Sequence, residues 1–465
     1  MSSNQSPAER TQALQAAVSA IAAGDFDATT RLLASPLWQT LEADFWNAEH
    51  PLPPDARESV ATYLRLAKLL WHRAGLGQAH PIALYKTTLL SSKAIETALR
   101  VLARIYAGCN LGYCPPEPGL WRTIYALTGY LNSERFPDRV NRLALTNQVL
   151  QLWLMAWLNP LSLAPGRLPV AVRLVGILSK TCSFTLSSPT PAGSGLAAAD
   201  LLSDMPPMPF ARVPASWEPT APLYINAQDA AFTMRELATP PSRNSPNDVY
   251  EALLQSATQV GLSVQEMQDF VRRSMREFGY SNARAAPRVG RADPVTTAVG
   301  FIECWGALQN QSKPNGKSAG HTTYPAVVIN HSDAGFLLRY ELTTPLLCVG
   351  AILCLRGNDA EPWSLSAVRW LEDSNGTVLV GCEVMCNFAS THVAQTAKRG
   401  QHLPIISFLK GDATHVVSPY DSAQADVVTQ LQLDNESWVV SAPAEVGLDW
   451  QLSQVLDTTA AKREG

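Results

Sequence analysis

The hydrophobic pattern of this chain changes its period near residue 288. Before that point, apolar residues recur at the three- and four-residue spacing of a helix, as in residues 55–74. After it, short apolar runs alternate with polar residues at a period of two. A helix and a strand need these different periods to bury one face. We therefore predict an α+β chain, with an all-helical N-terminal region followed by antiparallel β structure.

The helical pattern is strongest in nine segments. They are residues 7–23, 55–74, 81–107, 120–133, 137–158, 169–179, 226–238, 247–260 and 263–278. Two of them begin with a capping box, Ser6 with Glu9 and Ser263 with Glu266. Several are apolar nearly all round, which is typical of helices inside a bundle. Residues 1–185 are accordingly predicted to form a helical bundle or a repeat-like domain.

Eight prolines crowd residues 187–223, in a stretch that is also rich in serine, alanine and glycine. Such a composition favours a linker, or an irregular strap on a domain surface. We therefore expect residues 186–283 to be a proline-rich linker followed by helices.

The period-two pattern beyond residue 288 predicts at least seven strands. They are residues 295–302, 326–329, 336–340, 350–355, 364–371, 378–385 and 405–409. Asn315-Gly316, Gly357-Asn358 and Asn375-Gly376 are turn signals between them. We predict a β-barrel over residues 284–398, a small β domain or barrel extension over 399–457, and a disordered tail over 458–465.

Charge and hydropathy exclude several classes of protein. The 465 residues carry a net charge of −4, whereas proteins that coat nucleic acid or anionic membranes are usually strongly basic. Trp305, Trp363 and Trp370 lack the basic surroundings of a single-strand RNA platform. The longest apolar run, residues 149–158, is about half a membrane span. We expect a cytoplasmic protein with no integral membrane segment and no nucleic-acid partner.

No catalytic or metal-binding motif is found. Asn315-Gly316-Lys317-Ser318 resembles the end of a phosphate-binding P-loop, but Gln311 stands where that motif needs glycine. The eight cysteines form no C-x-x-C pair and have no histidine at zinc-ligand spacing, so we interpret them as buried apolar residues. The chain is predicted not to be an enzyme, with no catalytic residue, no metal and no cofactor.

An arginine cluster lies where the helical pattern gives way to strands. It contains Arg284, Arg288 and Arg291, and Pro287 biases the residue before it towards an extended conformation. Arginine can form two hydrogen bonds with guanine O6 and N7, can pair with phosphate, and can stack on a base. The cluster therefore suits an anionic guanine nucleotide. Either Arg284 with Arg288 or Arg288 with Arg291 could be the effective pair.

A tight turn between two strands carries the second candidate feature. Asn330 and Ser332 can hydrogen-bond nearby backbone groups, and Gly335 supplies a permissive backbone. The same side chains could instead face the base edge or phosphate of a ligand. A structural turn and a binding turn are both consistent with these residues alone.

Together, R-x-x-x-R at the entry to a barrel and N-x-S-x-x-G at a strand end resemble the PilZ family. The strands around 349–353, 368–370 and 380–383 extend the likeness, which covers residues 284–388. PilZ domains are small barrels that bind cyclic di-GMP, a bacterial second messenger. The resemblance implies that this ligand is bound by Arg284, Arg288, Arg291, Asn330, Ser332 and Gly335. Two departures are the insert at residues 303–323 and Asn330 in place of the commoner aspartate.

The helical part is similar to a PilZ subgroup with a long helical N-terminal region. Residues 120–134 and 151–163 carry this likeness. The resemblance implies a cytosolic effector that relays cyclic di-GMP, through an unknown protein partner of the helical region, to surface attachment, type IV pili, biofilm or motility. The alternative is a degenerate barrel that serves as a protein-interaction scaffold without binding nucleotide.

Overall fold

The computed structural model describes residues 96, 99, 102–103, 106–107, 113, 116 and 119–460, with gaps at 135, 137, 165, 186–194, 211–212, 214–215, 240–247, 280–287, 313–319, 342–346, 359, 375–376, 397–401, 421–429, 434–435, 442 and 448. The helices predicted at 7–23 and 55–74, and most of the one at 81–107, lie outside this range. The chain divides into two compact units. The first comprises residues 1–160, 166–260 and 270–283, and the second comprises 161–165, 261–269 and 284–465.

Helices of the first unit lie where the sequence predicts them. They are α7 (Leu120–Asn132), α8 (Arg139–Trp157), α9 (Leu168–Leu178), α10 (Gln228–Leu237) and α11 (Asp248–Gln259), with short 3-10 turns η1 (Pro160–Ser162) and η2 (Ser179–Thr181). Their core holds an aromatic cluster in which Tyr125 packs against both Trp121 and Trp153. All three rings are almost completely buried, as expected of helices inside a bundle.

The helix α12 (Val264–Gly279) confirms the second capping box. Its Glu266 carboxylate accepts a hydrogen bond from the Ser263 backbone N–H at 2.8 Å, and the Glu266 N–H donates to the Ser263 hydroxyl at 3.2 Å. Two of the backbone donors that a helix leaves unpaired at its start are thereby satisfied.

The expectation of an all-helical N-terminal region is wrong over residues 183–226. This stretch contains β1 (Ser183–Thr185), β2 (Leu196–Asp200), β3 (Met208–Pro209) and β4 (Pro222–Asn226), which form an antiparallel sheet in the order β1-β4-β2-β3. Alanines 197–199 favour a helix by intrinsic propensity. Here they are buried in the interior strand β2, which pairs with β4 on one side and with β3 on the other. Tertiary packing has overridden local preference, so these strands replace part of the predicted linker.

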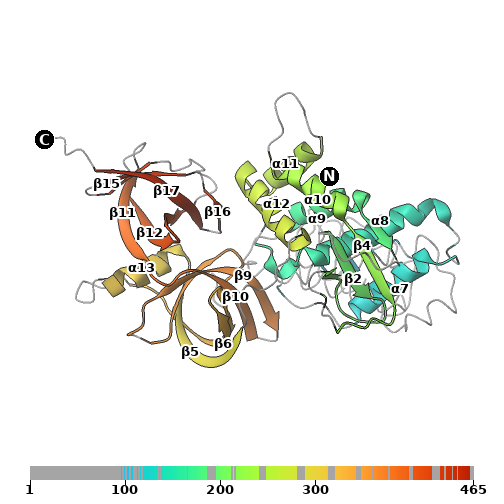
Figure 1. Ribbon diagram of the computed structural model, residues 1–465, viewed down its shortest axis with the longest axis horizontal. Helices are drawn as coiled ribbons and strands as arrows, with labels where there is room; N and C mark the ends of the chain where they lie inside the picture. Colours follow the sequence, from blue (N-terminus) through green and yellow to red (C-terminus); the bar gives the residue numbers. More distant parts are fainter. Residues whose placement is uncertain are drawn as a thin grey trace, which may run out of the picture. The chain divides into compact units, whose positions relative to one another are not determined.

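A closed barrel of six antiparallel strands opens the second unit (Figure 1). The strands are β5 (Val289–Val299), β6 (Tyr324–Ser332), β7 (Gly335–Tyr340), β8 (Ile352–Arg356), β9 (Ser364–Ser374) and β10 (Thr377–Cys386), arranged β10-β7-β6-β5-β8-β9 and closed by β9 on β10. The predicted antiparallel barrel is confirmed. We refer to it as the first barrel.

The remaining strands form a second closed ladder. They are β11 (Ser390–Thr396), β12 (His402–Lys410), β13 (Ala413–Pro419), β14 (Gln430–Leu433), β15 (Glu436–Val440), β16 (Glu445–Val446) and β17 (Trp450–Ala460). Six of them close on themselves because β13 pairs with β17, and β16 adds to the edge of β17. We call this the second barrel. It begins with β11, inside the range predicted for the first barrel. It ends with β17, which reaches Ala460, so residues 458–460 of the predicted tail lie in a strand.

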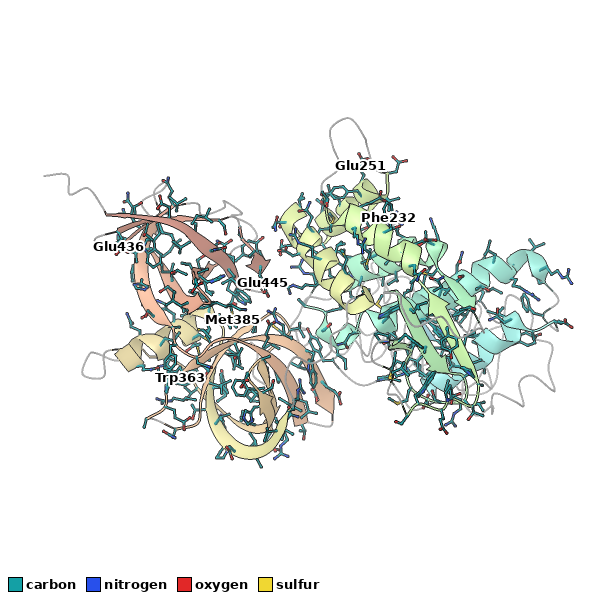
Figure 2. All side chains as sticks on the ribbon, viewed as in Figure 1. Phe232, Glu251, Trp363, Met385, Glu436 and Glu445 are labelled. Atoms are coloured by element: carbon teal, nitrogen blue, oxygen red, sulfur yellow. The ribbon has the colours of Figure 1, made fainter. Side chains whose placement is uncertain are left out.

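A helix in the insert joins the two barrels. The helix α13 spans Phe301–Ser312, so most of it lies in the insert at residues 303–323. It is preceded by Gly300, whose φ of 94° would be strained for other residues. Buried residues of α13 and of strands from both barrels form one continuous core. Met385, labelled in Figure 2, belongs to that core. The two barrels are therefore packed as one body.

In the part of the chain that the structure describes, no helix combines the length and the hydropathy needed to cross a membrane.

Candidate cyclic di-GMP site

Antiparallel pairing brings Arg288, the described member of the arginine cluster that precedes β5, beside the predicted binding turn. In the β5–β6 ladder, Val289 is opposite His331 and Gly290 is opposite Asn330. Arg288 immediately precedes Val289, so continuing the register places its backbone level with Ser332. Arg288 is exposed. The two features, about forty residues apart in sequence, thus meet at one end of the first barrel.

The other two arginines of the cluster are less completely described. Arg284 lies outside the described residues. The backbone of Arg291 belongs to β5, in the register shift between Gly290 and Asp293. A second register shift lies across β6, between Val328 and Asn330 in its pairing with β7. Such bulges often occur beside binding sites, where they redirect side chains.

Two buried side-chain atoms on β6 have no hydrogen-bond partner in the described structure: Oδ1 of Asn330 and Nδ1 of His331. The sequence left open whether the Asn330 side chain hydrogen-bonds within its own turn. Its Oδ1 atom makes no such bond in the described structure. An unpaired buried acceptor costs about 1–3 kcal/mol relative to a paired one. Both atoms could gain a hydrogen bond from a ligand without losing one.

Gly335 is required for space rather than for an unusual backbone angle. It is not among the described glycines with positive φ. It lies opposite Glu383 on β10, and a Cβ atom added to it would overlap the carbonyl oxygen of Cys382. The explanation by a permissive backbone is therefore wrong for this glycine. It lets β7 approach β10 closely where the hairpin of Asp333 and Ala334 turns back.

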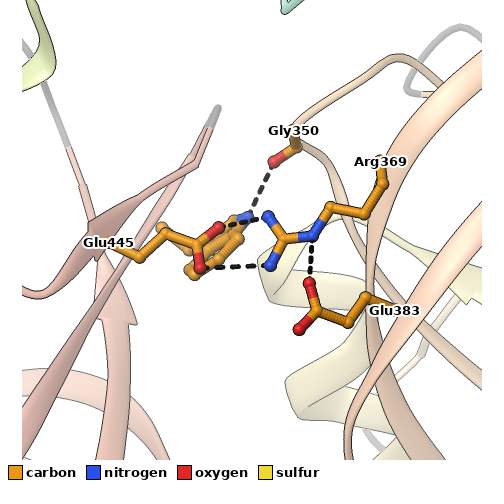
Figure 3. Close-up of polar contacts among 5 residues, drawn as sticks. Gly350, Arg369, Glu383 and Glu445 are labelled. Atoms are coloured by element: carbon orange, nitrogen blue, oxygen red, sulfur yellow. Dashed lines mark hydrogen bonds and ion pairs between the residues drawn. The ribbon is translucent and has the colours of Figure 1, made fainter. Parts of the chain in front are cut away.

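An arginine and two glutamates that connect to this turn through β10 were not predicted as site residues. Arg369 on β9 bonds Glu383 through Nε at 2.6 Å and pairs with Glu445 of the second barrel through both terminal nitrogens (Figure 3). Burial alone would lower the pKa of Arg369, but Glu445 and then Glu383 raise it above its ordinary value. Charged residues within otherwise apolar strands were the available sequence signal. That signal could not show that Arg369 pairs with Glu445, which lies 76 residues further along the chain.

All six described cysteines are free, and all but Cys182 are buried. Burial raises the pKa of the Cys382 thiol to about 12, with Arg369 opposing this shift only in part. Among the described residues, no group of His, Cys, Asp and Glu side chains is arranged to hold a metal ion.

Comparison with known families agrees with the geometry. A closed six-stranded antiparallel barrel, with Arg288 immediately before the strand that pairs with β6, has the architecture that the resemblance to PilZ domains implies. Residues 255–390 match the middle PilZ domain of the cyclic-di-GMP receptor FimW, and residues 2–190 match the N-terminal domain of that receptor. These matches cover more than two thirds of the chain. The chain therefore belongs to the FimW family of cyclic-di-GMP receptors, and the PilZ resemblance is confirmed.

A search of the curated proteins found no match.

Proposed function

We propose that the first barrel binds cyclic di-GMP where the start of β5 meets the β6–β7 hairpin. The ligand residues are Arg284, Arg288, Arg291, Asn330, Ser332 and Gly335. The observation that carries this proposal is the ladder in which Val289 lies opposite His331, because continuing it brings Arg288 level with Ser332. Membership of a family of cyclic-di-GMP receptors supports the choice of ligand.

Each residue has a distinct part in this proposal. Arg288, with Arg284 or Arg291, donates to guanine and phosphate oxygens, for which the planar guanidinium is well shaped. The unpaired Oδ1 of Asn330 accepts from an N–H donor of the base. Ser332 adds a hydroxyl hydrogen bond, and Gly335 keeps the hairpin close to β10. No step needs a catalytic group, so the protein acts as a receptor rather than as an enzyme.

Signal relay follows from contacts that the arginines make only when the nucleotide is bound. A ligand shifts a conformational equilibrium only through different contacts in the two states. Arginines that close around the nucleotide would provide this difference. We propose that a partner protein binds the helical region in the cytoplasm and responds to this conformational difference. Through that partner, the protein would control pili, surface attachment, biofilm or motility. The resemblance to the helical PilZ subgroup supports this step.

The binding site can be tested by titrating the purified protein with cyclic di-GMP in a calorimeter. Hydrogen bonds to charged groups contribute about 1.5–3 kcal/mol. Arg288→Ala should therefore weaken binding by roughly 10- to 150-fold. Ser332→Ala, which removes a neutral hydroxyl, should weaken it by a smaller factor of about 2–10.

Arg356→Ala is the matched control. It removes a cation from β8, opposite Thr296 and seven residues along β5 from Val289, and should leave the affinity unchanged. Wild-type protein that takes up no nucleotide would contradict the proposal and favour the scaffold function. Full affinity in both site variants would show that the site lies elsewhere. For the relay, pull-downs from the native host should recover a partner whose amount changes when nucleotide is added.

A further inference from the structure

The binding hairpin is linked to the second barrel by consecutive contacts. The first contact joins the hairpin to β10. Gly335 is opposite Glu383, and the Val384 N–H donates to the carbonyl oxygen of Ala334 at 3.0 Å. Because Gly335 leaves no room for a side chain, the backbone around Glu383 cannot shift without moving the hairpin.

The second contact joins β10 to β9 through a bulge. In this ladder Val368 is opposite Cys382 and Trp370 is opposite Gly381, so Arg369 is the extra residue of a register shift. A bulge turns its extra side chain away from the regular alternation. Here the guanidinium reaches Glu383, with Nε at 2.6 Å from the carboxylate.

The third contact crosses from the first barrel to the second. The two terminal nitrogens of Arg369 bind the two carboxylate oxygens of Glu445 on β16, a bidentate arrangement with strict geometry. The Trp450 indole N–H on β17 also donates to the Gly350 carbonyl at 2.8 Å. Gly447 permits this packing, because a Cβ there would overlap the Trp450 ring. The side chains of Arg369 and Glu445 are only 28% and 20% exposed.

We propose that Arg369 is a positioning residue through which the second barrel sets the affinity of the nucleotide site. Glu445 orients Arg369, Arg369 holds Glu383, and Glu383 fixes the strand against which the hairpin is formed. A hairpin already held in its binding geometry loses less conformational freedom on binding. The second barrel is then a regulatory module, and anything that displaces β16 weakens nucleotide binding. This inference rests on the proposed function of the first barrel.

The decisive variant is Glu445→Gln. It removes a negative charge, so simple electrostatics would strengthen the binding of an anionic nucleotide. Loss of positioning predicts the opposite, a decrease in cyclic di-GMP affinity of about fivefold or more, which is typical of coupling between sites. Arg369→Gln should weaken binding similarly. The double variant should bind cyclic di-GMP no less tightly than the single variant with the lower affinity, because both changes break the same linkage.

Hydrogen exchange provides an independent measurement, because coupling is reciprocal. In the wild type, cyclic di-GMP should slow amide exchange in the segment from Glu445 to Trp450, and in Glu445→Gln it should not. Glu436→Gln is the matched control: it removes a glutamate from the second barrel that bonds Trp438 rather than Arg369, and should leave the affinity unchanged. Melting curves would verify that each variant is folded.

Unchanged or tighter binding by Glu445→Gln would overturn this inference and leave the proposed function intact. Wild-type protein that binds no cyclic di-GMP would instead overturn the proposed function, and this inference with it.

Discussion

At the scale of single residues, Asp449 shows how a side chain distant in sequence completes a helix. Gly300, which precedes α13, has no side chain with which to cap it. The Asp449 carboxylate accepts the Phe301 N–H at 2.8 Å instead. Desolvation raises the pKa of Asp449 above its ordinary value of 3.8, and hydrogen bonds from the Phe301 and Asp449 N–H groups oppose this shift. Its other oxygen has no partner in the described structure.

A pH-dependent effect of Asp449→Asn follows from the sign of this shift. A raised folded-state pKa means that the ionised form is penalised, so wild-type stability decreases as the pH rises through that pKa. Asparagine keeps a capping oxygen without the charge. Asp449→Asn should therefore be at least as stable as the wild type at pH 7, and this advantage should disappear below about pH 4.

Urea denaturation across this pH range would measure the effect. Asp449→Ala is the comparison, because it loses the cap as well as the charge and should be about 0.5–2 kcal/mol less stable than Asp449→Asn. An asparagine variant that is much less stable than the wild type at pH 7 would contradict the burial argument.

At the scale of elements, α13 is the structural connection between the barrels. Cys304, Ala307 and Leu308 lie in the core shared by both. On another side of the helix, the Trp305 indole N–H donates to the His392 carbonyl on β11 at 3.3 Å. The insert that separates the two binding motifs therefore has a structural role.

Leu308→Ala should lower the free energy of unfolding by about 2–5 kcal/mol, because it leaves a cavity in that shared core. Leu409→Ala makes the same change at a side chain that is 70% exposed and should cost less than about 0.5 kcal/mol. Chemical denaturation of the two variants makes the comparison. Equal stabilities would show that α13 is not part of the core.

At the scale of the whole second unit, the shared core predicts that the two barrels unfold together. Ile406 of β12 is completely buried in this core. Cys382 of β10 lies in the first barrel and is itself buried. If the two barrels open together, a cavity made in the second barrel should increase the exposure of the Cys382 thiol in the first barrel.

Ile406→Ala should accelerate alkylation of Cys382 by at least tenfold, since a core truncation costs about 2–5 kcal/mol and opening controls the reaction. Mass spectrometry of the labelled Cys382 peptide over time would measure the rate. Ile302→Ala, at a side chain that is 62% exposed, is the control and should leave it unchanged. An unaltered rate in Ile406→Ala would mean that the barrels open independently.

Local patterns in the sequence were sufficient for much of the architecture. The helical period before residue 288 located the helices α7 to α12, and the period of two after it located strands of the first barrel. The capping box predicted at Ser263 is present in the structure. The arginine cluster and the turn identified the PilZ class because both are short, contiguous motifs. Each of these signals is carried by residues within a few positions of one another.

Tertiary structure alone decided the features that join distant segments. The central strand at Ala197–Ala199, the closure of the second barrel by β13 on β17, and the pairing of Arg369 with Glu445 depend on neighbours supplied by remote parts of the chain. An alanine run is compatible with a helix or a strand, and an arginine can pair with any exposed carboxylate. Only packing, which selects one set of neighbours and excludes the others, determines which of these arrangements forms.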